Sequence, residues 1–366
     1  MESLSLNSAI TQLQDRQLLL DALTRLGQAE SPAISRTAHV LLADVLVNLG
    51  RYAEAAAILE QFKTGMDDGT ARDLPMRSYA ELVEGKLADK QGNLDQAIKI
   101  FAAVMDNKAY PGKIRDLGRL ALARAEIVRE KNNPEQAEEE TRAQPQEEEA
   151  PHTAGTAEER LLAFIGGKSE SSLLMDAFNI LLEEDIFRTN PQALEKLTGW
   201  VNARDAARQP AAMYAMGSLL LAKDDLAGAV KMAEDGLSKY PQSLPVQTLS
   251  LNTITTLLDK NRVEDAERLI SKYPGTSPGL VFQQGALAFR KGDYPLAQSL
   301  FREAARRASE KTAESALFNE NLAALNANDA AGAAALVKEA AGSAQLREHI
   351  LFEQAHYAAK RMNPQA

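Results

Sequence analysis

Apolar residues recur along the chain at helical spacing, in pairs of segments separated by short polar turns. The clearest pair lies between residues 285 and 304. Tyr294, Ala297, Phe301 and Ala304 fall at i, i+3, i+7 and i+10, which places them on one face of a helix. Gly292 lies between this helix and the preceding apolar segment, and glycine permits the backbone angles that end a helix. The pattern predicts two helices joined by a tight turn.

The same layout recurs at six other places in the chain. At each, a polar turn precedes a second helix with an alanine at an equivalent position. These turns begin at Gly50, Gly92, Asn132, Asp224, Asn261 and Asn328, and the alanines of all seven copies are Ala55, Ala97, Ala137, Ala229, Ala266, Ala297 and Ala333. Small residues on the first helices are expected to let paired helices approach closely; they are Ala43, Gly85, Gly217 and Gly285.

This arrangement resembles the tetratricopeptide repeat, a helix-turn-helix unit of about 34 residues. The resemblance is strongest at Gly85 to Phe101 and at Gly285 to Ala304. The tryptophan of a strong repeat is missing, since the one Trp of the chain, Trp200, lies outside all seven copies. The resemblance implies an all-α fold in which stacked hairpins form a right-handed superhelical solenoid, because one hairpin alone cannot bury its apolar face.

An acidic stretch interrupts the repeats. Residues 138–140 and 147–149 are all glutamate, Pro145 and Pro151 lie nearby, and large apolar side chains are almost absent. Such a segment buries too little surface to offset its ordering entropy. We therefore expect an N-terminal lobe at 1–137, a flexible acidic linker at 138–157 and a C-terminal lobe at 158–366, ending in a capping helix at about 344–361. The linker could instead be a docking segment for a basic partner.

Composition and charge exclude several function classes. The net charge is −10, so binding to nucleic acid or to an anionic membrane surface is not expected. The absence of cysteine excludes disulfides, thiolate metal sites and cysteine nucleophiles. No apolar run is long enough for a membrane span, so no direct membrane insertion is expected. The start of the chain is unlike a signal peptide, which favours a cytoplasmic location, or a periplasmic one if the native N-terminus was removed.

Two local motifs are weak indicators of chemistry. Gly166-Gly167-Lys168-Ser169 looks like the end of a phosphate-binding loop, but Leu162 stands where that motif needs glycine, which favours a helix-ending turn. His349, Glu353 and His356 share one face of the last helix and could ligate a metal. No second Glu-x-x-His supports a metal centre, so they are interpreted as ordinary surface residues. The sequence predicts no enzyme, with no catalytic residue, metal or cofactor.

The resemblance to tetratricopeptide repeats also implies a binding groove. With the aligned alanine as residue twenty of each unit, the fifth, ninth and twelfth residues point inward by family analogy. In the C-terminal lobe these positions give a largely apolar groove, and its expected partner-binding residues are Tyr214, Leu221, Leu251, Leu258, Phe282, Phe289, Phe318, Leu322 and Leu325. The N-terminal lobe is more polar there, with Asp44, Lys86 and Asp89. The inward residues could also simply pack against one another.

These observations favour a non-enzymatic scaffold or adaptor that binds a peptide or helix of another protein in the apolar groove. Some family members hold a C-terminal carboxylate with lysine and asparagine at the fifth and ninth positions, and the C-terminal lobe has neither there. One alternative is a structural subunit of a larger assembly, such as a bacterial envelope or secretion complex. The other is a helical metalloenzyme that uses His349, Glu353 and His356.

Overall fold

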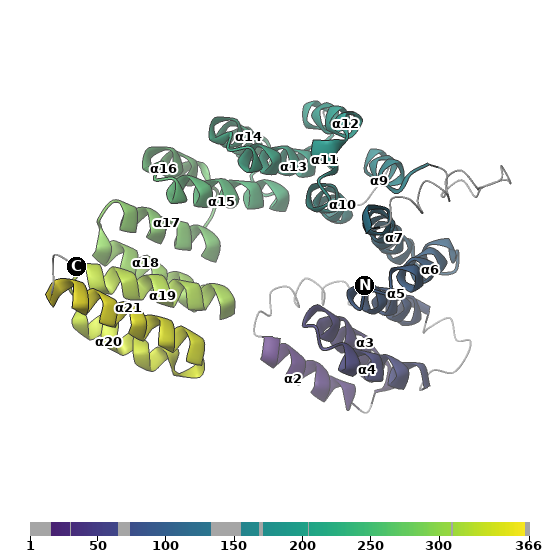
Figure 1. The fold of residues 1–366 in the computed structure, drawn as a ribbon, viewed down its shortest axis with the longest axis horizontal. Helices are drawn as coiled ribbons and strands as arrows, with labels where there is room; N and C mark the ends of the chain where they lie inside the picture. Colours follow the sequence, from purple (N-terminus) through teal and green to yellow (C-terminus); the bar gives the residue numbers. More distant parts are fainter. Residues whose placement is uncertain are drawn as a thin grey trace. The chain divides into compact units, whose positions relative to one another are not determined.

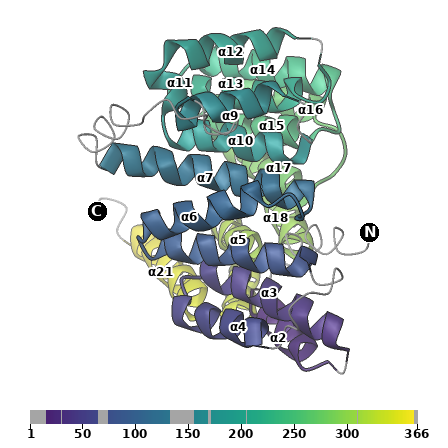
Figure 2. The same ribbon diagram turned by 90° about the vertical axis from the view of Figure 1, so that its right-hand side faces the viewer.

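The computed structural model describes residues 16–29, 31–64, 74–132, 155–167, 171–203, 205–308 and 310–362. Over these residues it contains nineteen α-helices and one short 3-10 helix, and no strand (Figures 1 and 2). The expected all-α fold of stacked helical hairpins is confirmed. Two compact units divide the chain, one of Arg16–Lys196 and one that contains Leu197–Ala366, and they are called the N-terminal and C-terminal units below.

The N-terminal unit contains two hairpins, and further helices lie before and after them in the chain. The unit begins with α2 (Arg16–Gly27), and two hairpins follow, α3 (Pro32–Asn48) with α4 (Tyr52–Thr64) and α5 (Leu74–Lys90) with α6 (Leu94–Asp106). The remaining helices are α7 (Gly112–Asn132), α9 (Ala157–Gly166), α10 (Ser171–Glu183) and α11 (Ile186–Thr189), and α12 (Pro191–Asn202) contains the boundary between the units. The first helices α3, α5 and α7 contact one another in chain order.

The C-terminal unit contains four consecutive hairpins and a final helix. The hairpins are α13 (Gln209–Ala222) with α14 (Leu226–Lys239), α15 (Leu244–Asp259) with α16 (Val263–Lys272), α17 (Pro278–Arg290) with α18 (Tyr294–Arg307), and α19 (Glu310–Asn326) with α20 (Ala330–Glu339). The 3-10 helix Ala340–Gly342 then leads to α21 (Ala344–Met362). The first helices α13, α15, α17 and α19 contact one another in order and form one layer.

One turn geometry joins both helices of six hairpins. At the second residue after the end of each first helix, φ is positive; these residues are Gly50, Gly92, Asp224, Asn261, Gly292 and Asn328. In the turn at Gly292, the Gly292 N–H donates to the Phe289 carbonyl at 3.0 Å and the Asp293 N–H donates to the Ala288 carbonyl at 3.0 Å. The other five turns repeat both hydrogen bonds. This is the Schellman motif, in which a left-handed residue satisfies carbonyls at a helix end.

The aligned alanines lie where the alignment requires. Ala55, Ala97, Ala229, Ala266, Ala297 and Ala333 are all buried. The seventh copy, at Asn132 and Ala137, lies largely outside the described residues, since α7 ends at Asn132.

Glycines bring paired helices close together, as expected. A methyl group on Gly85 would lie 2.3 Å from a ring carbon of Phe101, and one on Gly285 would lie 2.9 Å from the ring of Phe301, so only glycine fits at both crossings. Gly217 leaves space for the side chain of Leu249, which belongs to the following hairpin. It does not serve the contact between α13 and α14, the two helices of its own hairpin.

Most of the expected linker at 138–157 lies outside the described residues. Its flexibility and the limits of the two expected lobes therefore stay predictions. The helices on either side of it, α7 and α9, contact each other within the N-terminal unit. Arg160 of α9 forms an ion pair with Glu126 of α7, and Lys131 of α7 donates to Glu184 Oε2 at 2.8 Å. The described ends of the segment are thus held together.

Candidate functional site

The first-helix layer of the C-terminal unit contains the nine residues of the expected groove. They come from α13, α15, α17 and α19, so each hairpin contributes at least two of them. Eight of the nine are half-buried; they are Tyr214, Leu221, Leu251, Phe282, Phe289, Phe318, Leu322 and Leu325. The exception is Leu258, which is 3% exposed and packs in the core. Eight side chains therefore reach the surface in part, and Leu258 is not available to a partner. We call these eight residues the apolar face.

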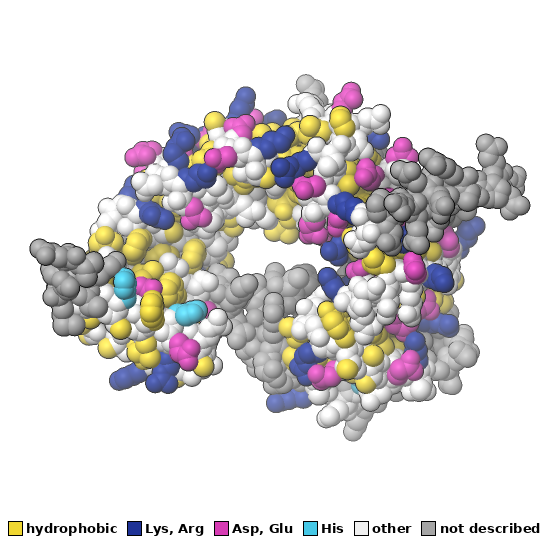
Figure 3. Space-filling model, in the orientation of Figure 1, with side chains coloured by type: hydrophobic (Ala, Val, Ile, Leu, Met, Phe, Trp, Pro, Cys, Tyr) yellow, Lys and Arg dark blue, Asp and Glu magenta, His cyan; other side chains and the backbone are white. Residues whose placement is uncertain are grey.

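Three aromatic rings on the apolar face are held by neighbouring rings. Phe282 meets Phe301 edge-on with ring centroids 5.3 Å apart, and Phe289 meets Tyr294 in the same way at 5.3 Å. Phe318 lies 6.4 Å from the ring of His349 on α21. Each ring is supported on one side while part of its surface stays accessible. Such fixed aromatic surfaces lose little conformational entropy when a partner packs on them. Hydrophobic side chains are also visible over the C-terminal helices in Figure 3.

The ninth positions between these apolar residues are small or apolar. They are Ser218, Thr255, Ala286 and Leu322. The exposed Thr255 hydroxyl accepts a hydrogen bond from Gln283 Nε2 at 2.7 Å and donates to the Leu251 carbonyl at 2.9 Å. No charged side chain occupies these four positions, so an apolar ligand meets no charge there that would have to be desolvated.

The equivalent positions of the N-terminal unit have the opposite character. The fifth residues, Val40 and Leu82, are buried. At the ninth positions Lys86 Nζ donates to Asp44 Oδ1 at 2.9 Å, and the Tyr79 hydroxyl donates to Asp44 Oδ2 at 2.7 Å. Burial, together with the Asp44 carboxylate, raises the pKa of Tyr79, so the phenol stays protonated and serves as a donor. This group of Asp44, Tyr79 and Lys86 is called the polar cluster below.

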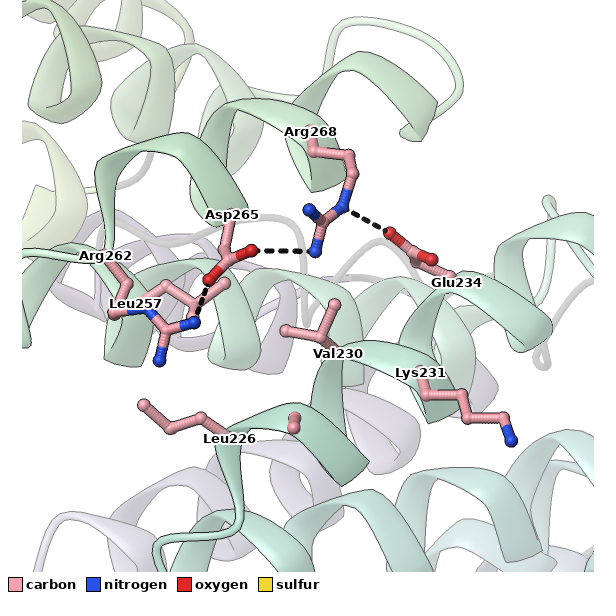
Figure 4. Close-up of a pocket in the computed structure, with 9 residues that line it drawn as sticks. Leu226, Val230, Lys231, Glu234, Leu257, Arg262, Asp265 and Arg268 are labelled. Carbon is pink, nitrogen blue, oxygen red and sulfur yellow. Dashed lines mark hydrogen bonds and ion pairs between the residues drawn. The ribbon is translucent and has the colours of Figure 1, made fainter.

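A separate pocket of about 230 Å³ lies between α14, α15 and α16 (Figure 4). Leu226, Val230 and Leu257 form its apolar part. Nothing in the sequence pattern indicated this pocket, because its residues come from three helices and look like ordinary amphipathic faces.

Charged side chains of the pocket are joined in one network. Asp265 accepts from Arg262 and from Arg268, and Arg268 Nε also donates to Glu234 at 3.1 Å. Burial acts to raise the pKa of Glu234, but its hydrogen bonds with Lys272 and Arg268 leave that pKa below the usual value. The charged groups of this network are paired with one another. The network therefore links α14 to α16 and is not an anion-binding site.

The two weak motifs of the sequence have structural explanations. Gly167 caps α9, and its N–H donates to the carbonyls of Ala163 at 2.9 Å and Phe164 at 3.2 Å, so this glycine ends a helix. The His356 ring stacks on Phe352 with centroids 6.3 Å apart. Across the part of the chain that the structure describes, no group of three His, Cys, Asp or Glu side chains is placed to hold a metal ion.

In the described ranges, no helix is both long and apolar enough to cross a lipid bilayer.

Comparisons with known proteins agree with the helical repeat. The model of a tetratricopeptide repeat family matches residues 40–114, which include α4, α5, α6 and most of α3. A comparison with curated protein sequences finds no match. Similar solved structures include a human IFIT1 dimer with m7Gppp-AAAA, at 14% identity and a TM-score of 0.40, over 98% of this chain and 92% of that chain. They also include the APC/C hetero-tetramer Cut9–Hcn1, at 12% identity and a TM-score of 0.25, over 91% of this chain and 82% of that chain.

The family match and the turn geometry point to the same repeat. The matched residues hold the turns at Gly50 and Gly92, and the four hairpins of the C-terminal unit repeat the same left-handed turn and buried alanine. Residues 40–114 therefore match the tetratricopeptide repeat, and the described residues form an all-helical array of repeated hairpins that is similar to it.

Proposed function

We propose that the chain is a protein-interaction scaffold whose C-terminal unit binds a helix or an extended apolar segment of a partner protein on the apolar face. The observation that carries this proposal is the row of half-buried aromatic and leucine side chains on four successive first helices. Repeat arrays use such extended surfaces for binding. Monomeric proteins rarely expose a contiguous apolar surface unless a partner covers it.

Phe282, Phe289 and Phe318 are the proposed anchors of this contact. Aromatic side chains bring a large apolar area at a small loss of rotamer entropy. Complete burial of one such side chain contributes about 1.5–3 kcal/mol, which corresponds to roughly 10- to 150-fold in affinity. Binding energy in protein interfaces is usually concentrated in a few such residues. We therefore expect one or two of the three to account for most of the affinity.

The experiment begins with a pull-down of the full chain and mass spectrometry of what it retains. The dissociation constant of the purified partner is then measured for the parent and for Phe282→Ala, Phe289→Ala and Phe318→Ala. Leu296→Ala is a matched control, because Leu296 is an exposed apolar residue on the second helix α18. Since the contact is apolar, the dissociation constant should change little between low and high salt.

A second variant separates binding from folding. Thr255 is exposed and lies among the apolar residues, so Thr255→Arg adds a long charged side chain without changing the core. Thr255→Arg should reduce the affinity for the partner at least 10-fold, while the melting temperature of the variant stays within a few degrees of that of the parent. Normal affinity of Thr255→Arg and of all three folded alanine variants would reject the apolar face as the site. A partner held at fixed stoichiometry through purification would indicate an assembly subunit.

A further inference from the structure

A row of carboxamide side chains lies beside the apolar face. The sixth residue of the hairpin, which follows the fifth-position residue of the apolar face, is Asn252 on α15, Gln283 on α17 and Asn319 on α19. Gln283 Nε2 donates to Thr255 Oγ1 at 2.7 Å, so the sixth position of one hairpin contacts the ninth position of the hairpin before it. Asn252 is exposed, and the other two are half-buried. We call these three residues the carboxamide row.

The carboxamide row has free hydrogen-bond acceptors. The NH2 group of Gln283 is held by Thr255, and Asn319 Nδ2 donates to the Ser315 carbonyl at 2.7 Å, so both side chains are oriented by the protein itself. Among the described residues, no donor is bonded to Gln283 Oε1 or Asn319 Oδ1, and the Asn252 side chain forms no hydrogen bond. A carbonyl oxygen of this kind can accept from an N–H group of a ligand.

The binding groups of this surface repeat once per first helix. Each of α15, α17 and α19 presents one carboxamide and one apolar fifth-position residue, namely Leu251, Phe282 and Phe318. The axes of packed helices lie about 8–10 Å apart. A polyproline II segment that crosses the helices has three residues per turn, so it presents the same side every three residues, or about 9.3 Å. A β-strand presents the same side about every 6.6–6.8 Å and loses register with the helices. The spacing therefore favours polyproline II.

The hydrogen-bonding capacity of the row favours the same conformation. In an α-helix the main-chain N–H groups bond to carbonyls of the helix, so a helical partner would cover the carboxamide row without satisfying it. Burial of an unpaired polar group weakens binding. A polyproline II segment has no internal hydrogen bonds, so its N–H groups can donate to the row. Its preformed conformation also suits a surface lined by aromatic rings, such as those of Phe282 and Phe318.

We propose that the apolar face binds a partner segment in the polyproline II conformation. In this arrangement an apolar side chain of every third residue packs on Leu251, Phe282 or Phe318, and main-chain N–H groups donate to the carboxamide row. A segment of about seven residues spans the three helices. It should contain apolar residues three apart, and a residue other than proline wherever an N–H group is needed. This inference rests on the proposed function and narrows it, because it excludes a helical partner.

The test uses a synthetic peptide that the chain itself selects. A displayed library of random peptides of about 12 residues, or about four turns of polyproline II, is selected on the purified full chain. Peptides that bind Thr255→Arg equally well are discarded, because they do not use the apolar face. The retained sequences should contain apolar residues three apart. Isothermal titration calorimetry then gives the dissociation constant of one synthesised peptide.

Loss of a carboxamide should weaken the binding of this peptide. Gln283→Met and Asn319→Leu keep a side chain of similar length and remove the acceptor, so each should raise the dissociation constant roughly 3- to 10-fold. A peptide bound as a helix would bind these variants equally or more tightly, since an apolar group replaces a desolvated amide. Gln242→Met is the matched control, because Gln242 is exposed in the turn before α15 and lies outside the row. Circular dichroism and melting temperatures confirm that all three variants fold.

Methylation of the peptide main chain tests the bound conformation separately. Each methyl group removes one N–H donor, and the affinity should fall about 3-fold or more at every third residue and less at the residues between them. A bound β-strand would instead lose affinity at every second residue. The period of the loss therefore distinguishes polyproline II from a strand on the same surface.

Each outcome decides the proposal. Weaker binding to both Gln283→Met and Asn319→Leu, with a three-residue period of methylation losses, supports it. Normal binding to either variant, or a period other than three, overturns the polyproline II arrangement. If that peptide still depends on Phe282 and Phe318, the apolar face remains a binding site and the proposed function stands. A selection that retains no peptide also overturns this inference, and the pull-down with the alanine variants then decides the proposed function alone.

Discussion

The two units use the same hairpin and present different first-helix surfaces. In the N-terminal unit the ninth positions hold the Asp44–Lys86 ion pair, and the fifth positions are buried. In the C-terminal unit the fifth positions reach the surface as aromatic or leucine side chains, and the ninth positions are uncharged. The C-terminal unit also contains an ion pair, formed by Arg302 and Glu320. This pair joins α18 to α19, and the Glu320 side chain is only 1% exposed.

This difference distinguishes the positions that are required to close a hairpin from the positions that can vary between units. The left-handed turn residue and the buried alanine are shared by both units, because every hairpin must close. The exposed positions of the first helices are not needed for closure, so they differ between units. A repeat protein can therefore present a polar surface in one unit and an apolar one in another without changing its backbone plan.

The largest expected effect comes from the buried charge of the C-terminal unit. Arg302→Met leaves the Glu320 carboxylate buried without its guanidinium, at a cost of about 3 kcal/mol, the lower end for buried pairs because Arg302 is partly exposed. Burial raises the pKa of Glu320 even though Arg302 opposes this shift. A carboxyl with a raised folded-state pKa favours folding more as the pH falls, so the loss should shrink in acid.

Chemical denaturation at pH 7 and pH 4 measures both parts of this prediction. The double variant Arg302→Met with Glu320→Leu is the control, and it should regain most of the stability because no buried charge is left unpaired. Glu339 also loses its ion pair with Arg302, but its side chain is 43% exposed and stays in contact with water. An Arg302→Met protein as stable as the parent at pH 7 would show that the pair contributes nothing.

The next largest loss of stability is expected from a leucine at the aligned alanine, and it should be similar in both units. Ala97 and Ala297 are each 0% exposed, so a leucine at either site has no room and should cost about 1–3 kcal/mol. Ala331→Leu, at an exposed site of α20, is the control and should be nearly neutral. The free energy of unfolding from denaturant titration tests the shared hairpin interior. A neutral Ala297→Leu beside a destabilising Ala97→Leu would mean that the units differ inside the hairpin as well.

The turn should show a smaller, residue-specific effect. Gly292 has a φ of 79° and open space around its Cα, so only backbone conformation opposes a side chain there. Gly292→Val should lower stability by roughly 1 kcal/mol or more, because β-branched residues avoid positive φ. Gly292→Asn should cost less, since Asn261 and Asn328 hold φ values of 57° and 60° at equivalent turns. Equal melting temperatures for both variants would contradict this explanation.

The smallest effect is expected at the polar cluster. The Lys86 side chain is partly exposed, so the Asp44–Lys86 pair should contribute only about 0.2–1 kcal/mol. A double-mutant cycle with Lys86→Met and Asp44→Asn measures this coupling, and high salt should reduce it. A coupling above 2 kcal/mol would indicate that the cluster is a structural element of the N-terminal unit and would weaken the contrast with the apolar face.

The repeat was predictable because local signals define it. Glycine, asparagine or aspartate at a turn, followed by an alanine at fixed spacing, identified six hairpins that the structure contains. The polar ninth positions at Asp44 and Lys86 also followed from the alignment. The partner-binding role of the groove residues remains a prediction.

Other features depend on contacts that sequence spacing does not encode. Arg302 and Glu320 look like surface charges until α19 packs on α18. Leu258 has the spacing of an inward residue, yet its neighbours in the core enclose it. The exposure of Phe352 is visible only once the packed side of α21 is known.

The order of the helices in space also has a kinetic consequence. The main contacts of the described residues join helices that are adjacent or next but one along the chain. Each contact therefore closes a short loop, and the search for native pairs stays local. We expect rapid folding that can begin at any hairpin and spread to its neighbours, and unfolding that proceeds one hairpin at a time.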